Sequence, residues 1–217
     1  NDRRLYRTMT PASSPPDCYD DLNLSFSKAW DLIEPGASKR TSPAHTPVVG
    51  SVDASGTAQL RVMVLREANR DNRLLRFHTD SRSTKISDYR NNSRVSILMY
   101  DPTEKLQLRL FGTAHIETDS LAVDSAWIES TTFARRCYLA ESAPGSVSDA
   151  PTSGLPAWIE GQQPIEDQLT EARANFAILW CQVEELEWLY LANSGHRRAR
   201  WTWDDGQQNW SGRWLVP

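Results

Sequence analysis

The sequence has no long apolar run and few cysteines, and these shortages exclude several classes of protein. No stretch approaches the ~18 consecutive apolar residues that a membrane-spanning helix needs, so no membrane span is expected. The three cysteines, Cys18, Cys137 and Cys181, are too scattered to indicate a disulfide framework or a metal knuckle. Sparse, unpaired cysteines are typical of a reducing compartment, and no signal peptide is recognisable, so we expect a cytoplasmic protein.

An excess of positive charge is also lacking. The 217 residues include 24 Lys and Arg against 28 Asp and Glu, which gives a formal net charge of -4. A chain with this balance has no overall field that would attract nucleic acid or an anionic membrane, and we expect neither as a partner. Any anionic ligand must therefore be held by a local cluster of cations and backbone N–H groups.

The length is sufficient for one sizeable hydrophobic core. Residues 1–20 are rich in Pro, Ser and Arg and are predicted to be poorly ordered, whereas residues 21–217 are predicted to form a single domain. A helix is expected to begin at Asp21 and to end at Glu34-Pro35-Gly36. Further helices are expected near residues 83–92, 119–130 and 164–175, and residues 141–163 are read as a long loop.

Strand-like alternation dominates the rest of the chain. The segments with this pattern are Val48–Val52, Ala58–Arg66, Leu74–Thr79, Val95–Tyr100, Leu106–Glu117, Phe176–Leu191, His196–Trp203 and Asn209–Val216. Short turns that contain Asn, Asp or Gly separate several of them, which favours antiparallel pairing. The fold class predicted is mainly β, a barrel of antiparallel strands with flanking helices.

One junction between a predicted strand and a predicted helix, FHTDSRSTK at residues 77–85, is rich in hydroxyls and cations. A helix that begins near Ser83 directs its free N–H groups toward this junction, which favours a phosphate or carboxylate there. The hydroxyl donors are Ser81, Ser83 and Thr84, and the cations are Arg82 and Lys85. The alternative is a plain helix cap, in which Ser83 bonds the helix and both cations are solvated.

Two predicted strands carry polar side chains at regular spacing. In the first, one face holds Arg61, Met63 and Leu65, and the other holds Val62, Val64 and Arg66. Such a strand could lie beside a ligand with an anionic end and a flat apolar body, or it could be an ordinary barrel strand with solvated arginines. In the second, Gln107 and Arg109 share a face, where Gln107 could bond the edge of a heterocycle or simply face solvent.

Together these segments resemble the pyridoxine/pyridoxamine 5'-phosphate oxidase family, the FMN-binding split barrels. Residues 61–66 resemble the family's R-x-V-L-basic strand, and residues 91–95 resemble its N-N-P-R-V turn with Ser in place of Pro. His78-Thr79 stands at an aromatic-Thr pair, and Ser83-Thr84-Lys85 stands at S-R-K with Thr84 in place of Arg. Near the C-terminus, the resemblance returns more weakly, and it places Tyr190 at an aromatic position.

The resemblance implies a split β-barrel that binds FMN at the interface of a homodimer. The residues implied to hold the phosphate and ribityl chain are Arg61, Arg66, Ser83, Thr84 and Lys85. Those implied to line the flavin or bond its edge are Val62, Met63, Val64, His78, Thr79 and Gln107. Tyr190 and Arg200 are implied to reach the flavin from the other subunit, where Arg200 could stabilise negative charge on the reduced ring.

The substrate does not follow from the resemblance. In the family's substrate-binding segments, this chain retains Arg136, while His196 and Arg198 stand in exchanged order where Arg and His are usual. An imidazole and a planar cation differ in charge and bond geometry, so the substrate cannot be carried over. Arg136, His196 and Arg198 stay candidates for binding a small molecule, for which an anion is one option; a solvated cluster of arginines is the alternative.

The function implied is that of an enzyme, an FMN-dependent oxidoreductase whose substrate is unassigned. The flavin would take a hydride from a substrate or NAD(P)H and pass electrons to oxygen or another acceptor. No catalytic side chain and no metal ligand is expected. Three alternatives stay open: a non-catalytic flavin- or haem-binding barrel, a genuine vitamin B6 oxidase with an altered pocket, and an interaction module without cofactor. The loop at 141–163 is either a lid or a connector.

Overall fold

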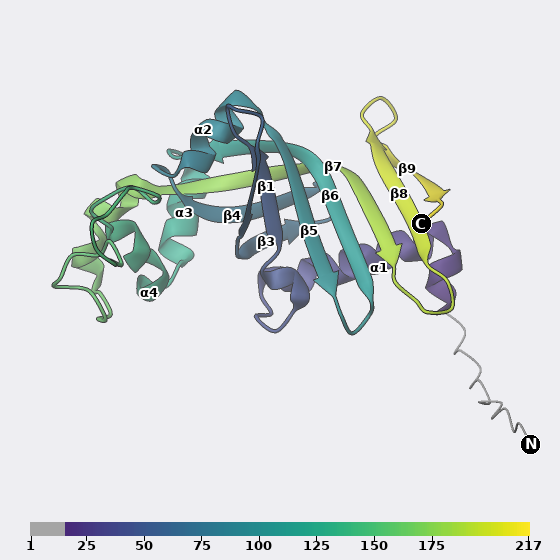
Figure 1. Cartoon of the computed structure of the whole chain (residues 1–217), viewed down its shortest axis with the longest axis horizontal. Helices are drawn as coiled ribbons and strands as arrows, with labels where there is room; N and C mark the ends of the chain where they lie inside the picture. Colours follow the sequence, from purple (N-terminus) through teal and green to yellow (C-terminus); the bar gives the residue numbers. More distant parts are fainter. Residues whose placement is uncertain (1–15) are drawn as a thin grey trace, which may run out of the picture.

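Nine antiparallel strands form one sheet in the computed structural model, which describes residues 16–217 (Figure 1). The strands are β1 (Val48–Val52), β2 (Ala58–Val62), β3 (Leu65–Asn69), β4 (Leu74–Asp80), β5 (Arg94–Asp101), β6 (Leu106–Glu117), β7 (Phe176–Tyr190), β8 (Arg197–Asp204) and β9 (Asn209–Leu215). Their order is β2-β1-β5-β6-β7-β4-β3, with β8 between β7 and β9. The predicted mainly β, antiparallel fold is confirmed.

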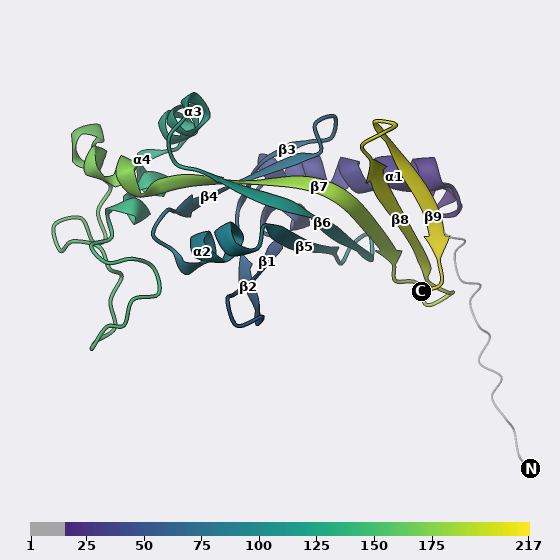
Figure 2. The ribbon, with the colours of Figure 1, turned by 90° about the horizontal axis from the view of Figure 1, so that it is seen from above.

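Strand β7 is the long axis of the fold and crosses most of the molecule in Figure 2. One edge pairs with β6, whereas the other pairs with β4 through its first half and with β8 through its second half. The sheet therefore divides along β7. Gly112 lies at a register shift between β6 and β7, where an added Cβ would be 1.8 Å from the carbonyl oxygen of Gln182. Only glycine fits this close approach without movement of the backbone.

The prediction of one strand over Ala58–Arg66 is wrong, because the chain leaves the sheet at Met63 and Val64. Strand β2 ends at Val62 on one edge of the sheet, and β3 begins at Leu65 on the opposite edge. Residues 63 and 64 therefore join the two edges of the sheet covalently, and no ladder of hydrogen bonds pairs β2 with β3 in the described part of the chain. This opening is what is expected of a split barrel.

The α-helices are α1 (Leu22–Ile33), α2 (Thr84–Asn91), α3 (Leu121–Glu129) and α4 (Thr132–Arg135). The 3-10 helices are η1 (Asp17–Asp20), η2 (Glu34–Ala37), η3 (Pro43–His45), η4 (Arg136–Leu139), η5 (Glu166–Leu169) and η6 (Glu171–Asn175). The helix predicted over residues 164–175 is thus two 3-10 turns. Leu169 and Ala172 are its buried residues, and a spacing of three suits 3-10 geometry. No helix of residues 16–217 is long and apolar enough to cross a membrane.

Helix α1 closes one side of the sheet, as the predicted apolar spacing requires. Asp21 caps it by accepting a hydrogen bond from the Leu24 N–H at 2.9 Å. Trp30 and Ile33 are fully buried in the main core, and Phe26 packs against Trp201 at 5.5 Å between ring centroids. A second apolar cluster lies under α3, where Trp127 packs on Phe176.

The predicted N-terminal segment lies largely outside the described residues, which begin at residue 16. Its last residues are packed: Tyr19 in η1 is 1% exposed and lies against the rings of Trp188 and Tyr190. The division into a segment of residues 1–20 and a single domain of residues 21–217 stays a prediction. The loop predicted at 141–163 contains turns and bends but no helix or strand.

Candidate functional site

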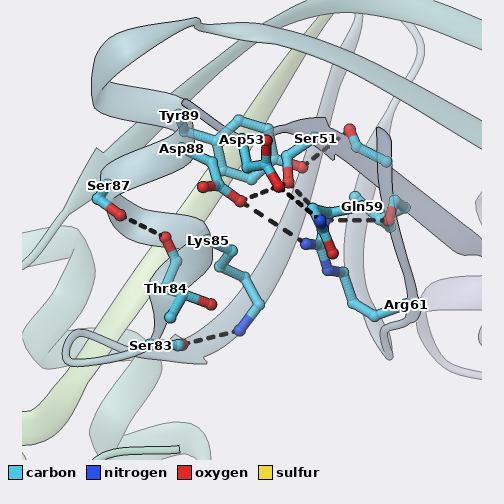
Figure 3. Close-up of polar contacts among 12 residues, drawn as sticks. Ser51, Asp53, Gln59, Arg61, Ser83, Thr84, Lys85, Ser87, Asp88 and Tyr89 are labelled. Carbon is cyan, nitrogen blue, oxygen red and sulfur yellow. Dashed lines mark hydrogen bonds and ion pairs between the residues drawn. The ribbon is translucent and has the colours of Figure 1, made fainter. Parts of the chain in front are cut away.

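The junction between β4 and α2 does not act as a plain helix cap. Ser83 is the N-cap residue of α2 by position, but its side chain bonds no N–H of the helix. Its hydroxyl instead donates to the carbonyl of Asp80 at 2.8 Å and accepts from Lys85 Nζ at 2.8 Å. Lys85 also donates to Thr79 Oγ1 at 3.0 Å, so two hydroxyls orient its ammonium group. Figure 3 shows the contact between Lys85 and Ser83. The cation is thereby held in place rather than free in solvent.

Lys85 lacks a carboxylate at ion-pair distance among the described residues. Burial lowers the pKa of Lys85, and the positive charge of Arg61 lowers it further, against smaller opposing effects of Asp80 and Asp88. Both main causes destabilise the charged ammonium, and a bound anion would relieve them. Arg82, the other cation of the junction, has a structural partner instead, since it pairs with Asp80 at 2.7 Å.

A second cation, Arg61, contacts side chains of β1 and α2. Its guanidinium donates to Ser51 Oγ at 2.8 Å, and Ser51 donates in turn to Asp88 at 2.9 Å (Figure 3). Asp88 also lies 3.9 Å from the Arg61 guanidinium and is 7% exposed. Sequence reasoning missed both Ser51 and Asp88, because only their pairing across β1 and α2 reveals them.

These cations line one end of a cavity of about 380 Å³ at the opening between β2 and β3. The predicted cofactor residues that line it are Arg61, Val62, Met63, Val64, Arg66, His78, Thr79, Ser83 and Lys85. Thr84 does not line it. Lining residues that sequence reasoning missed are Asp80, Ala134, Cys137, Tyr138 and Pro144. The cavity thus has a cationic, hydroxyl-rich end and walls that include apolar side chains.

His78 lies in the wall of this cavity as a neutral imidazole. Burial lowers its pKa to about 3, and the charges of Arg66 and Arg76 add to the effect. Its ring packs on the edge of Phe176, with centroids 4.9 Å apart. The buried Nε2 has no hydrogen-bond partner among the described residues.

A separate cluster of charged side chains lies where the start of β6 and the end of β7 adjoin β8. Glu187 is 1% exposed and accepts hydrogen bonds from Arg109 and Arg198 at 3.0 Å and from Arg200 at 2.8 Å. Burial alone would raise the pKa of Glu187, but the hydrogen bonds from Arg200 and Arg198 and the charge of Arg109 outweigh it, so the pKa is lowered. One carboxylate therefore orients three arginines, which together keep an excess of positive charge.

A comparison with protein families finds a match over the first part of the chain. Residues 27–118 match the family model described as pyridoxamine 5'-phosphate oxidase, FMN-binding domain. These residues make up less than half of the chain, so the match shows a similarity to this family over residues 27–118. The matched residues contain the whole β4–α2 junction and the three cations that line the first cavity, Arg61, Arg66 and Lys85. They end before β7 and β8, so Glu187, Arg198 and Arg200 of the second cluster lie outside the match, whereas Arg109 lies within it.

Solved structures share this fold. A pyridoxamine 5'-phosphate oxidase-related, FMN-binding protein from Nostoc punctiforme is 22% identical, with a TM-score of 0.66, over 89% of this chain and 96% of its own. PhzG from Burkholderia lata, in complex with tetrahydrophenazine-1-carboxylic acid, is 17% identical, with a TM-score of 0.68, over 96% of this chain and all of its own. No curated protein matches the sequence.

The remaining residues that the family resemblance implied are not gathered at the cavity within one copy of the chain. Gln107, Tyr190 and Arg200 belong to β6, β7 and β8 and do not line the first cavity. Strand β8 lies well away from α2 in Figure 1. Gln107 is paired with Leu189, and Arg200 is paired with Glu187, so these residues share one face of the sheet. Tyr190 points to the opposite face, where its ring lies 4.2 Å from that of Tyr19.

The candidate substrate residues are also dispersed in one copy. Arg136 donates to the carbonyl of Gln162 at 2.6 Å and lies over the ring of Phe133, outside the first cavity. His196 and Arg198 line a separate hollow of about 290 Å³ at the C-terminal end. A single chain therefore assembles the cationic cavity but does not assemble the predicted substrate site.

Proposed function

We infer that the protein is a cytoplasmic FMN-dependent oxidoreductase that works as a homodimer. The observation that carries this inference is the oriented, partly desolvated ammonium of Lys85, beside Arg61 and two hydroxyls, at one end of a cavity within an FMN-binding family domain. The three cysteines are free thiols, which supports a reducing compartment.

The cavity fits a flavin mononucleotide by its chemistry. A phosphate requires cations and N–H or O–H donors, which Arg61, Lys85 and Ser83 supply at one end. A flat apolar ring requires apolar walls, which Val62 and Val64 supply. When bound, FMN would provide the hydride-accepting chemistry and pass electrons from an organic substrate or NAD(P)H to oxygen or another acceptor. The side chains would bind and orient it and exclude water.

An exposed apolar surface supports the homodimer. Residues Leu60, Val62, Leu98 and Tyr100 are 70%, 64%, 40% and 48% exposed. The register across β2, β1, β5 and β6 places them on the same sheet face as Gln107, and we call this the outer face. Val62 belongs to this face and also lines the first cavity, so a second copy that covered the face would reach the cavity. Gln107 and Arg200 of the second copy would then complete the site.

The test is an absorbance spectrum of the purified protein after incubation with FMN and removal of the free cofactor. We expect retention of about one flavin per chain and weaker retention of riboflavin, which lacks the phosphate. Loss of all flavin on desalting would reject the cofactor assignment, and a retained haem spectrum after incubation with haem would favour the haem-binding alternative. Bleaching of the flavin band by NADPH without oxygen, with recovery in air, would establish the redox function.

A further inference from the structure

The Ser51 hydroxyl lies between two opposite charges behind the cationic end of the first cavity. It accepts a hydrogen bond from Arg61 Nη1 at 2.8 Å and donates one to Asp88 Oδ2 at 2.9 Å, and Figure 3 shows the three side chains together. A hydroxyl can donate and accept at the same time, so it satisfies both charged groups. Arg61 Nη2 lies 3.9 Å from the same carboxylate oxygen, beyond hydrogen-bond distance. The guanidinium and the carboxylate are therefore bridged by Ser51 and not joined directly.

The three groups differ in their access to the cavity. Ser51 is 3% exposed and Asp88 is 7% exposed, and neither of them lines the cavity. Arg61 lines it, and 22% of its side chain is exposed. Arg61 Nη1 also donates to the carbonyl of Val49 at 3.3 Å, which adds a contact with β1. The charge of Arg61 thus has two possible partners, a buried carboxylate on one side and an anion in the cavity on the other.

Direct contact with Asp88 would compete with a ligand for the Arg61 guanidinium. Opposite charges about 4 Å apart attract each other more strongly in a partly buried position than in water, and a guanidinium readily forms two parallel hydrogen bonds with a carboxylate. In such a pair, two donors of Arg61 would be directed at Asp88 and away from the cavity. The Ser51 hydroxyl opposes this closure, because it supplies each charge with a hydrogen bond while the 3.9 Å gap is kept.

We propose that Ser51 is a positioning residue, a spacer that keeps Arg61 from closing onto Asp88 and leaves its guanidinium available to an anion in the cavity. The anion is the phosphate of FMN, so the inference rests on the proposed function. Ser51 thereby increases the preference of the site for FMN over riboflavin without contact with either flavin. Asp88 is the charge against which the spacer acts, and removal of that charge should compensate for the loss of Ser51.

The experiment compares the FMN and riboflavin affinities of the wild type, Ser51→Ala, Asp88→Asn and the double variant by fluorescence titration. Ser51→Ala should bind FMN about tenfold more weakly and riboflavin as the wild type does, since one charge-assisted contact with the phosphate is lost. Asp88→Asn keeps an oxygen that can accept from Ser51, so its FMN affinity should be unchanged or higher. The double variant should bind FMN within about threefold of the wild type, because the charge that attracts Arg61 is gone.

The matched control is Ser87→Ala, which removes an exposed hydroxyl of α2 that donates to the Thr84 carbonyl at 2.7 Å and does not line the first cavity. Both flavin affinities should stay unchanged in this variant. The proposal is overturned if Ser51→Ala binds FMN like the wild type, or if the double variant binds FMN as weakly as Ser51→Ala. An equal loss of FMN and riboflavin affinity in Ser51→Ala would also overturn it, because a general packing defect predicts that result.

A crystal structure of flavin-free Ser51→Ala gives a readout that does not depend on the cofactor. We expect Arg61 Nη2 to move from 3.9 Å to about 2.7–2.9 Å from the Asp88 carboxylate, the range of a direct charge-assisted hydrogen bond. A guanidinium that keeps its wild-type position in this variant would overturn the spacer role. If the wild type binds no flavin, the proposed cofactor is rejected, whereas a closed pair of Arg61 and Asp88 in the variant would still establish Ser51 as the spacer.

Discussion

Glu187 accepts a hydrogen bond from Arg200 at 2.8 Å while it is 1% exposed, and this pair anchors the arginine cluster on the outer face. Replacement of Glu187 by Gln would leave three guanidinium groups close together without their common counter-charge. Removal of one partner of a buried ion pair costs about 3–5 kcal/mol, and the partial exposure of the arginines reduces this cost. We expect Glu187→Gln to lower the free energy of unfolding by about 2–3 kcal/mol in urea titrations.

Glu185 provides the matched control for this change. It lies 3.4 Å from the same Arg200, but it is more exposed and contacts one arginine of the cluster instead of three. Pairs of this kind contribute about 0–1 kcal/mol, so Glu185→Gln should lower the unfolding free energy by less than about 1 kcal/mol. Equal effects of the two variants would contradict the view that Glu187 is the common anchor.

Lys85 should discriminate FMN from riboflavin. Loss of one charge-assisted hydrogen bond to a phosphate costs about 1.5–3 kcal/mol, so Lys85→Ala should weaken FMN binding roughly tenfold to a hundredfold. Riboflavin lacks the phosphate, and its affinity should change little. Fluorescence titration of both flavins measures the two effects. The control is Lys39→Ala, at an exposed lysine that does not line the first cavity. A parallel loss of both affinities would place Lys85 away from the phosphate.

His78 should make stability depend on pH below neutrality. Its pKa is about 3 in the folded protein, against an ordinary value of 6.5, so the unfolded chain binds a proton that the folded chain does not. This contribution is complete above pH 6.5 and is lost progressively as the pH falls toward 3. Between pH 6 and 4, unfolding free energy should fall by about 1.4 kcal/mol per pH unit more in the wild type than in His78→Tyr.

Urea titrations at several pH values would measure this difference in slope. Carboxylates with lowered pKa, such as Glu187, add their own loss of stability in acid, but they do so in both proteins and cancel in the comparison. Identical slopes for the wild type and His78→Tyr would mean that the pKa of His78 in the folded protein is close to its ordinary value.

The local patterns of the sequence predicted elements well where neighbouring residues decide the structure. The alternation over Val48–Val52 and Leu106–Glu117 predicted β1 and β6 with their observed bounds, because turns flank both segments. The break at residues 63 and 64 could not be predicted, since apolar residues continue from Val62 to Leu65 without a turn signal. It arises because β2 and β3 join opposite edges of the sheet, which is a property of the tertiary fold.

The same distinction applies to the site. The β4–α2 junction is contiguous in sequence, so its residues could be predicted to lie together, whereas Ser51 and Asp88 reach Arg61 only through folding. Tyr190 shows how sensitive a strand is to register. A shift of one residue moves a side chain to the other face, and the residue opposite Gln107 is Leu189, not Tyr190. Leu189 therefore shares the face of Gln107, and the contact of Tyr190 with the partner's flavin stays a prediction.

The outer face offers a direct test of the homodimer. Leu98 is 40% exposed on this face and lies beside the paired Arg109, so a carboxylate there would be solvated in a monomer but buried in a dimer. The Arg109 guanidinium is already paired with Glu187, and desolvation of a further charge beside it costs several kcal/mol, more than its attraction to Arg109 returns. Leu98→Asp should therefore shift the protein from dimer to monomer at micromolar concentrations. Because Gln107 and Arg200 of the second copy would be lost, FMN affinity should fall together with dimerisation.

Leu121→Asp is the control for this variant, since Leu121 is 85% exposed on α3 and lies outside the outer face. It should remain dimeric and retain FMN. Light scattering after size-exclusion chromatography measures the mass, and the flavin absorbance across the same peak measures retention. Wild-type protein that elutes as a monomer with bound flavin would contradict a shared site. Leu98→Asp that stays dimeric would place the interface on another surface, because a charge in the centre of the outer face could not be accommodated there.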